Sequence, residues 1–140
     1  MNEKIIKKAE EIIAERIGGP QNFCALTFVE ADGYPHTTTI SISKADGIRW
    51  LTFCTGTGVR ASVIENCSKA SVCINSSEYH IGLVGTIEQI TDLDVKKEMW
   101  YNGLENHFSG WDDPNYCVLK FTAERYSLFV DWQDVKGNIT

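Results

Sequence analysis

The apolar residues of this chain recur with a helical period at the beginning and with a strand period over most of the rest. Between Ile5 and Ile17 an aliphatic residue returns every three or four positions, lysines and glutamates fill the other positions, and Gly18-Gly19-Pro20 ends the pattern. This spacing predicts an amphipathic N-terminal helix whose apolar stripe packs against the body of the protein. From Phe23 onward the apolar residues follow the shorter period of strands.

Three strands joined by tight turns are predicted first, at residues 23–29, 35–43 and 48–54. The runs Asp32-Gly33 and Asp46-Gly47 mark the two turns between them. Consecutive strands with such short connections pair as an antiparallel meander. The second strand is unusually rich in threonine and serine, so hydroxyl groups line part of the predicted sheet.

Strand patterns continue after this meander, at residues 70–75, 79–90, 116–122 and 125–132. Two helices are predicted between strands, one at residues 59–66 and one that starts at the capping-box-like run Thr91-Asp92. Six or seven strands with one helix before them and two between them predict a mainly β fold. We expect a closed or nearly closed antiparallel β-barrel, because closure leaves no exposed sheet edge. No linker or repeat interrupts residues 1–140, which predicts a single domain.

The stretch from Leu51 to Ser62 carries the candidate chemistry. An apolar strand ends in Thr55-Gly56-Thr57-Gly58, and a helical pattern begins at Val59. Such a junction presents backbone N–H groups, hydroxyls and the positive end of a helix dipole to an anion. Arg60 adds a guanidinium fork that suits phosphate oxygens. The spacing fits neither a Walker loop nor a dinucleotide fingerprint, so two hypotheses remain: a phosphate site, or an ordinary junction with a solvated arginine.

Charge and composition narrow the functional classes. A net charge of −6 argues against broad binding to nucleic acid or to anionic membranes. No apolar run approaches the roughly 20 residues that a membrane-spanning helix needs, so we expect a cytoplasmic protein. The five cysteines are scattered without a Cys-x-x-Cys pair, which predicts buried reduced thiols rather than a disulfide framework or a zinc site. The three histidines are far apart in sequence and predict no metal site.

Five motifs, spread over nearly the whole chain, stand out by their order and spacing. They are Gly33-Tyr34-Pro35 before Thr37-Thr38-Thr39-Ile40, Trp50-Leu51-Thr52-Phe53-Cys54-Thr55 before Arg60, Ile64-Glu65-Asn66, Gly82-Leu83-Val84-Gly85, and Phe108-Ser109-Gly110-Trp111-Asp112-Asp113-Pro114. In this order they resemble the FMN-binding split barrels related to pyridoxamine 5′-phosphate oxidase, and most of all the general-stress-protein branch. The resemblance implies a six- to seven-stranded antiparallel split β-barrel and a homodimer that binds FMN in clefts between its subunits.

The resemblance also implies roles for individual residues. Those that it assigns to the cofactor are Thr38, Thr39, Ile40, Phe53, Cys54, Thr55 and Arg60. The first three match a strand that faces the isoalloxazine ring, and the next three match a strand end beside the phosphate and ribityl chain. Arg60 stands where the family usually has a phosphate-binding lysine, which is the point where the sequence itself favours an anion. Trp111 is a further candidate, covering the flavin across the dimer interface, with core packing as the alternative.

Departures from the family pattern limit the expected chemistry. Thr38 stands where pyridoxamine phosphate oxidases have a flavin-binding arginine, and the C-terminal region lacks their arginine–histidine substrate motif. We therefore expect an FMN-dependent oxidoreductase for an unidentified small molecule or electron acceptor, and not oxidation of pyridoxamine phosphate. The alternatives are a non-catalytic carrier or stress-response protein that holds FMN, haem or a deazaflavin, and a dimeric module without ligand. No catalytic set emerges, and the pair Asp112-Asp113 is expected to be solvated or to cap a turn.

Overall fold

The computed structural model describes residues 2–57 and 59–139, and the side chains of all of these except residues 18 and 59–62. Within these residues the strands are β1 (Phe23–Val29), β2 (Pro35–Asp46), β3 (Trp50–Gly56), β4 (Lys69–Asn75), β5 (His80–Ile90), β6 (Tyr116–Val130) and β7 (Gln133–Asn138). The helices in the same part of the chain are α1 (Glu3–Gly18), α2 (Val59–Asn66), α3 (Leu93–Met99) and the 3₁₀ turn η1 (Leu104–Asn106).

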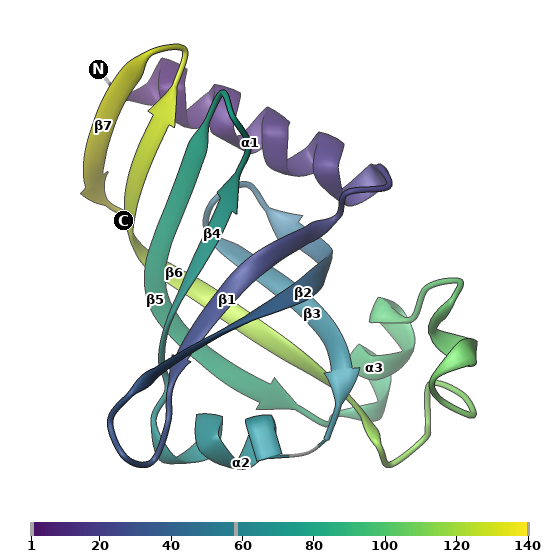
Figure 1. Cartoon of the computed structure of the whole chain (residues 1–140). Coiled ribbons are helices and arrows are strands. Elements are labelled where there is room, and N and C mark those ends of the chain that lie inside the picture. Colours follow the sequence, from purple (N-terminus) through teal and green to yellow (C-terminus); the bar gives the residue numbers. More distant parts are fainter. Residues whose placement is uncertain (1, 58, 140) are drawn as a thin grey trace.

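All seven strands of the described chain belong to one antiparallel sheet, in the order β3-β2-β1-β4-β5-β6-β7. β3 also pairs with the first half of β6, so the first six strands close into a barrel. β7 pairs only with β6 and extends the sheet outside the barrel (Figure 1). The predicted mainly β antiparallel barrel with an N-terminal helix and two further helices is therefore confirmed.

Helix α1 packs against the barrel through the stripe that its sequence predicts (Figure 1). Ile5, Ala9 and Ile13 are buried in the same apolar cluster as Leu26 and Phe53 of the barrel interior. Full burial of an isoleucine side chain contributes about 1.5–3 kcal/mol, so α1 is part of the core. None of the described helices is long and apolar enough to cross a membrane.

All five cysteines lie in the described chain, and none of them forms a disulfide. Cys24, Cys54 and Cys117 are buried and the other two are half-buried, as expected for thiols that pack as small apolar side chains. Burial raises the pKa of Cys24 to about 12, so this thiol stays protonated at neutral pH.

β6 is one strand of 15 residues, although the sequence predicts two strands at 116–122 and 125–132. Its pairing with β5 skips Glu124, which is the extra residue of a β-bulge opposite Gly85. The core residues of β6 accordingly carry odd numbers up to Ala123 and even numbers from Tyr126 onward. In the sequence alone, this change from odd to even positions looks like a turn between two strands. The prediction of two strands is therefore wrong.

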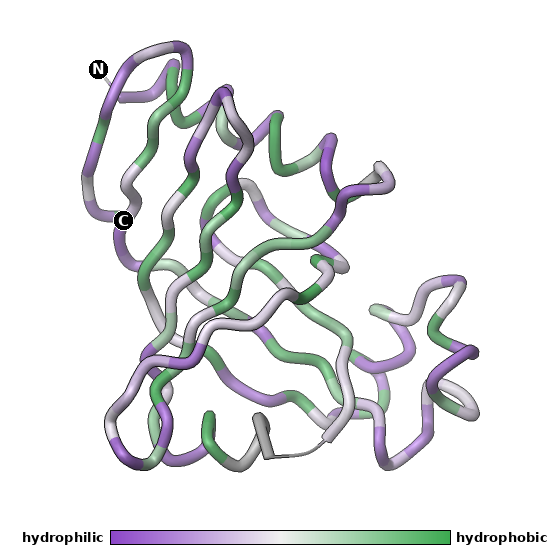
Figure 2. The backbone as a smooth tube through the Cα atoms, in the orientation of Figure 1, coloured by the Kyte–Doolittle hydropathy of each residue, from purple (hydrophilic) through white to green (hydrophobic). Residues whose placement is uncertain are grey.

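β7 lies beyond the predicted strands and follows a two-residue turn, Asp131-Trp132, between the paired residues Val130 and Gln133. The turn residues have φ values of 53° and 64°, a conformation that glycine or asparagine usually supplies. An ion pair between Lys8 and Asp131 ties the turn to α1. β7 itself is mostly hydrophilic (Figure 2), so the sequence lacks both the turn signal and the apolar alternation of a strand.

Candidate functional site

A cavity of about 410 Å³ opens where β2 and β3 meet the loop that follows α3. We name it the β2–β3 cavity. The residues that line it are Thr39, Ile40, Ser41, Cys54, Thr55, Gly56, Tyr101, Leu104, His107 and Phe108. Its volume lies within the usual range of small-molecule sites, about 300–1,000 Å³. Two strands and one loop, far apart in sequence, therefore build a single concave surface.

Four of the residues that the sequence assigns to a cofactor meet in this cavity: Thr39 and Ile40 from β2, and Cys54 and Thr55 from β3. Two of their neighbours do not line it. Thr38 is half-buried and faces Leu26 of β1 in the strand register. Phe53 has no exposed surface and belongs to the barrel core, so only its backbone is near the cavity.

The remaining two predicted residues are Trp111, which does not line the cavity, and Arg60, whose side chain is not described. Trp111 is half-buried and packs against the small apolar cluster of Cys54, Leu104, Tyr116 and Val118, without lining the cavity. The ammonium of Lys97 lies 5.4 Å from the centre of its ring. The side chain of Arg60 lies outside the part of the chain that the structure describes. Its helix, α2, begins three residues after Gly56, a lining residue, so the backbone brings the start of α2 close to this end of β3.

Beneath the cavity, buried polar groups fix the end of β3. The Cys54 thiol lies 3.4 Å from the Met99 carbonyl oxygen and 3.5 Å from the Tyr116 hydroxyl. That hydroxyl donates to the Lys96 carbonyl oxygen at 2.9 Å. Burial raises the pKa of both Cys54 and Tyr116, so both groups are uncharged at neutral pH. They connect the cavity floor to α3 and do not form an ionised catalytic pair.

The loop wall of the cavity is held by two residues outside it. Asp113 accepts hydrogen bonds from the backbone N–H groups of Ser109 and Asn115, both at 2.9 Å, and these bonds lower its pKa. Lys96 is only 3% exposed, and its ammonium donates to the Asp113 carbonyl oxygen at 2.9 Å. The ammonium also lies 5.3 Å from the centre of the Tyr116 ring. The expectation that a carboxylate of the pair Asp112-Asp113 caps a turn is confirmed for Asp113.

Sequence reasoning missed the residues of this loop wall. Phe108 opens the motif at residues 108–114 but is assigned no role at the cofactor, and Tyr101 and His107 lie outside every motif. They reach the cavity because η1 and its flanking turns fold back beside the ends of β2 and β3, with Phe108 N–H donating to the Leu104 carbonyl oxygen at 3.0 Å. The only signal in the sequence was the motif that begins at Phe108.

The chemistry of the lining is polar and nearly uncharged. Among the described lining residues there is no carboxylate, lysine or arginine. Burial raises the pKa of Tyr101, with the nearby Cys54 thiol as a second cause, so its phenol is neutral as well. Hydroxyls, backbone groups and aromatic faces suit a planar, hydrogen-bonding ring better than an ion. If the ring of a ligand carries an anionic group such as a phosphate, the positive charge that balances this group has to come from outside the lining. The start of α2 is the adjacent source of such charge.

The family model described as pyridoxamine 5′-phosphate oxidase matches residues 7–129, which include the strands of the closed barrel up to the penultimate residue of β6 and the whole β2–β3 cavity. The chain belongs to the pyridoxamine 5′-phosphate oxidase family. A search of curated protein sequences returned no match.

Solved structures share the fold. A Clostridium acetobutylicum protein related to general stress protein 26 of Bacillus subtilis has a TM-score of 0.85 at 24% identity, covering 99% of this chain and 97% of that one. An FMN-binding protein from Nostoc punctiforme gives 0.69 at 14% identity, with 99% and 97% covered. A haem-binding protein from Mycobacterium smegmatis gives 0.72 at 14% identity, with 95% of this chain and 57% of that chain covered. Proteins with this fold therefore bind different cofactors.

Proposed function

We propose that this member of the pyridoxamine 5′-phosphate oxidase family binds FMN in the β2–β3 cavity. The observation that carries the proposal is that Thr39 and Ile40 of one strand and Cys54 and Thr55 of another line the same hollow. The family resemblance assigns all four of these residues to the flavin. The strand that carries Cys54 and Thr55 leads directly to the start of α2, where Arg60 would hold the phosphate.

The lining fits the flavin ring better than it fits the phosphate. Thr39, Ser41 and Thr55 offer hydroxyls to the polar edge of the ring, and Tyr101 and Phe108 offer aromatic surface. Bound FMN would supply the acceptance and transfer of a hydride or of electrons, while these residues orient the ring and exclude water. The reaction partner is then a small molecule or an electron acceptor. Oxidation of pyridoxamine phosphate is not expected, because Thr38 replaces the arginine found in those oxidases.

We further propose a homodimer in the cytoplasm, with a second copy completing the flavin cleft. The outward faces of β1, β4 and β5 carry small uncharged residues, among them Ala25, Thr27 and Cys73. Phe23 and Val84, on the same face, are 43% and 39% exposed. A surface of small uncharged residues, with charges such as Lys69 and Glu88 at its edge and exposed apolar side chains within it, is typical of subunit interfaces. Light scattering at micromolar concentration should give twice the chain mass, and a monomeric mass would contradict the dimer.

The flavin site can be tested with two matched substitutions on β2. Thr39→Trp places an indole in the cavity, whereas Thr37→Trp adds the same side chain two residues earlier on the same strand face, outside the cavity. A flavin fluorescence titration should show at least about a hundredfold weaker FMN binding for Thr39→Trp and little change for Thr37→Trp. Light scattering on both variants shows whether the dimer is preserved. Equal weakening, with intact dimers, would place the flavin elsewhere.

A specific observation supports haem as the second candidate. His107 lines the cavity and is exposed, and a histidine imidazole is a common axial ligand of haem iron. The absorption spectrum of the purified protein after denaturation separates the candidates, because released FMN, deazaflavin and haem absorb differently. A Soret band that disappears in His107→Ala would favour haem and refute the flavin proposal. A non-catalytic FMN carrier would show the flavin spectrum but no turnover with any reductant and acceptor.

A further inference from the structure

Helix α3 buries a lysine and exposes a leucine, the reverse of what the hydrophobic effect favours. Lys96 is only 3% exposed, whereas Leu93 on the same helix is 54% exposed. Taking an ammonium out of water is costly, and exposing a leucine gives up the stabilisation that its burial would bring. Among the residues whose side chains the structure describes, Lys96 is also the only charged one that is buried. The hydrophobic effect therefore does not explain the orientation of α3.

No carboxylate pairs with the buried ammonium, since none of the ion pairs in the described part of the chain includes Lys96. The ammonium donates instead to the Asp113 carbonyl oxygen at 2.9 Å and lies 5.3 Å from the centre of the Tyr116 ring. The Asp113 carboxylate accepts hydrogen bonds from the N–H groups of Ser109 and Asn115. Those bonds lower the pKa of this carboxyl most, and the Lys96 charge is the weakest of the causes. The ammonium therefore contacts neutral groups and has no counter-ion against it.

One residue, Tyr116, separates the ammonium from the β2–β3 cavity. The Tyr116 hydroxyl donates to the Lys96 carbonyl oxygen at 2.9 Å and lies 3.5 Å from the Cys54 sulfur. The centre of the Tyr116 ring lies 5.3 Å from that of Phe108. Cys54 and Phe108 both line the cavity, whose described lining contains no charged group. At most two steps of 5.3 Å, through the fully buried Tyr116, therefore separate the ammonium from the aromatic wall of the cavity.

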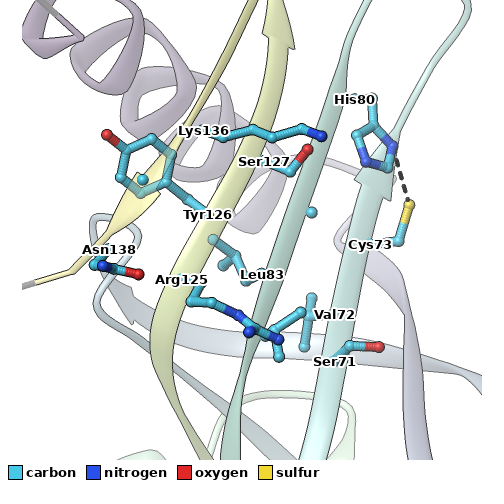
Figure 3. Close-up of a pocket in the computed structure, with 13 residues that line it drawn as sticks. Ser71, Val72, Cys73, His80, Leu83, Arg125, Tyr126, Ser127, Lys136 and Asn138 are labelled. Atoms are coloured by element: carbon cyan, nitrogen blue, oxygen red, sulfur yellow. Dashed lines mark hydrogen bonds between the residues drawn. The ribbon is translucent and has the colours of Figure 1, made fainter.

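Other cations of the described chain are less well placed. Arg125 and Lys136 are exposed and line a different hollow, over β5 on the outward face of the sheet (Figure 3). Lys97 is exposed as well, and its ammonium lies 5.4 Å from the centre of the Trp111 ring, which is not part of the lining. Water and salt screen exposed charges far more than buried ones. Among the described side chains of one protomer, Lys96 is therefore the cation whose field reaches the cavity with the least screening.

We propose that Lys96 makes the β2–β3 cavity prefer reduced FMN over oxidised FMN, an inference that rests on the proposed binding of FMN there. When FMN takes up two electrons and one proton, its ring gains one negative charge, whereas the charge of its phosphate is unchanged. A positive charge near the ring therefore favours the reduced form. Two unit charges roughly 10 Å apart, at an effective dielectric constant of about 20, shift an equilibrium about tenfold. Arg60, which is assigned to the phosphate, would bind both forms equally.

The test measures the affinity of the full-length protein for both forms of FMN. Fluorescence titration gives the dissociation constant of oxidised FMN, and anaerobic equilibration with a reference dye gives the reduction potential of bound FMN relative to free FMN. Lys96→Met should lower the preference for reduced FMN about tenfold, which for a two-electron couple lowers the potential by about 30 mV. Lys96→Gln, which also removes the charge but stays polar, should give the same shift. The matched control Lys97→Met removes an equal charge one residue away on the exposed side of α3 and should keep the wild-type potential.

Three results would overturn the proposal, and they separate its failure from that of the proposed function. If Lys96→Met and Lys96→Gln weaken both forms of FMN equally, the potential stays unchanged; Lys96 then only holds the loop wall through Asp113, and this inference alone fails. If Lys97→Met lowers the potential as much as Lys96→Met does, the effect is one of net charge and not of the buried ammonium. If the wild-type protein binds FMN in neither form, the proposed function fails and this inference fails with it.

Discussion

Gly85 stands opposite the β6 bulge, and the substitution Gly85→Ala should destabilise the barrel severely. A Cβ atom at this position would overlap the carbonyl oxygen of Thr122 and stand 2.9 Å from the Cα atom of Ala123. Both obstacles are backbone atoms of β6, so no side-chain rotation relieves them. β5 and β6 have to separate at the bulge, where the sheet is already irregular.

The magnitude follows from what this separation costs. Overpacking of a buried site typically costs about 1–3 kcal/mol, and each weakened ladder hydrogen bond adds about 0.5–1.5 kcal/mol. We expect the free energy of unfolding of Gly85→Ala to fall by about 3 kcal/mol. For a chain of this length the midpoint of thermal unfolding should then fall by about 10 °C. Urea denaturation followed by circular dichroism measures the first quantity, and a thermal scan measures the second.

Gly56→Ala is the matched control, because Gly56 also lies in a strand of the barrel. A Cβ atom there would meet the Asn115 carbonyl oxygen at 3.5 Å and the Phe108 ring at 3.8 Å, which are ordinary contacts. The control should be as stable as the wild type or slightly more so, by up to about 1 kcal/mol, because alanine restricts the unfolded chain. If Gly85→Ala is as stable as Gly56→Ala, the bulge tolerates a side chain and the steric account of Gly85 is wrong.

Three further predictions concern the sites and the core. Arg60→Ala should weaken FMN about ten- to a hundredfold and riboflavin hardly at all, because only FMN has the phosphate; fluorescence titration that shows equal losses would assign Arg60 a structural role. Lys96→Met removes the donor to the Asp113 carbonyl oxygen, so stopped-flow measurements should show FMN leaving about ten times faster, whereas the exposed Lys44→Met should not differ from wild type. Burial raises the pKa of Cys24 to about 12, so unfolding releases a proton above pH 9; between pH 8 and 10 the wild type should lose about 1 kcal/mol more stability than Cys24→Ala, and parallel pH profiles would contradict this.

The strand pattern was predictable wherever one face of a strand is buried and the alternation is regular. β1 and β4 alternate between buried and more exposed positions along their whole length, and their predicted and observed bounds agree closely. The pattern fails in β6 for a physical reason, since Glu124 shifts the inward face from odd to even residues without ending the strand. It fails in β7 because Asp131-Trp132 turns without glycine or asparagine and because an edge strand outside the barrel does not need a buried face.

The strand side of the β2–β3 cavity could be predicted from the sequence, but its loop wall could not. Local sequence contains the strand, the glycine-rich junction and the helix start, which predict an anion site at this point, and the family resemblance assigned Cys54 and Thr55 to the cofactor. The loop wall was not predictable, because Tyr101 and His107 reach the cavity through Lys96 and Asp113, which are 17 positions apart. The position of Trp111 could not be predicted from the sequence either. Its loop suggested a contact with the flavin, whereas in this protomer its side chain packs against the small apolar cluster of Cys54, Leu104, Tyr116 and Val118.

The inward face of β6 depends on a feature that no local pattern contains, the position of one unpaired residue. If Glu124 were paired regularly, the alternation of Phe121 and Ala123 would continue, so Arg125 would face the barrel core and Tyr126 would face outward. The bulge reverses this, so Tyr126 is buried and Arg125 is exposed. The first half of the same strand supports the β2–β3 cavity through Tyr116. The bulge therefore lets one long strand keep a buried face on both sides of the irregularity, and Gly85 is the residue that makes room for it.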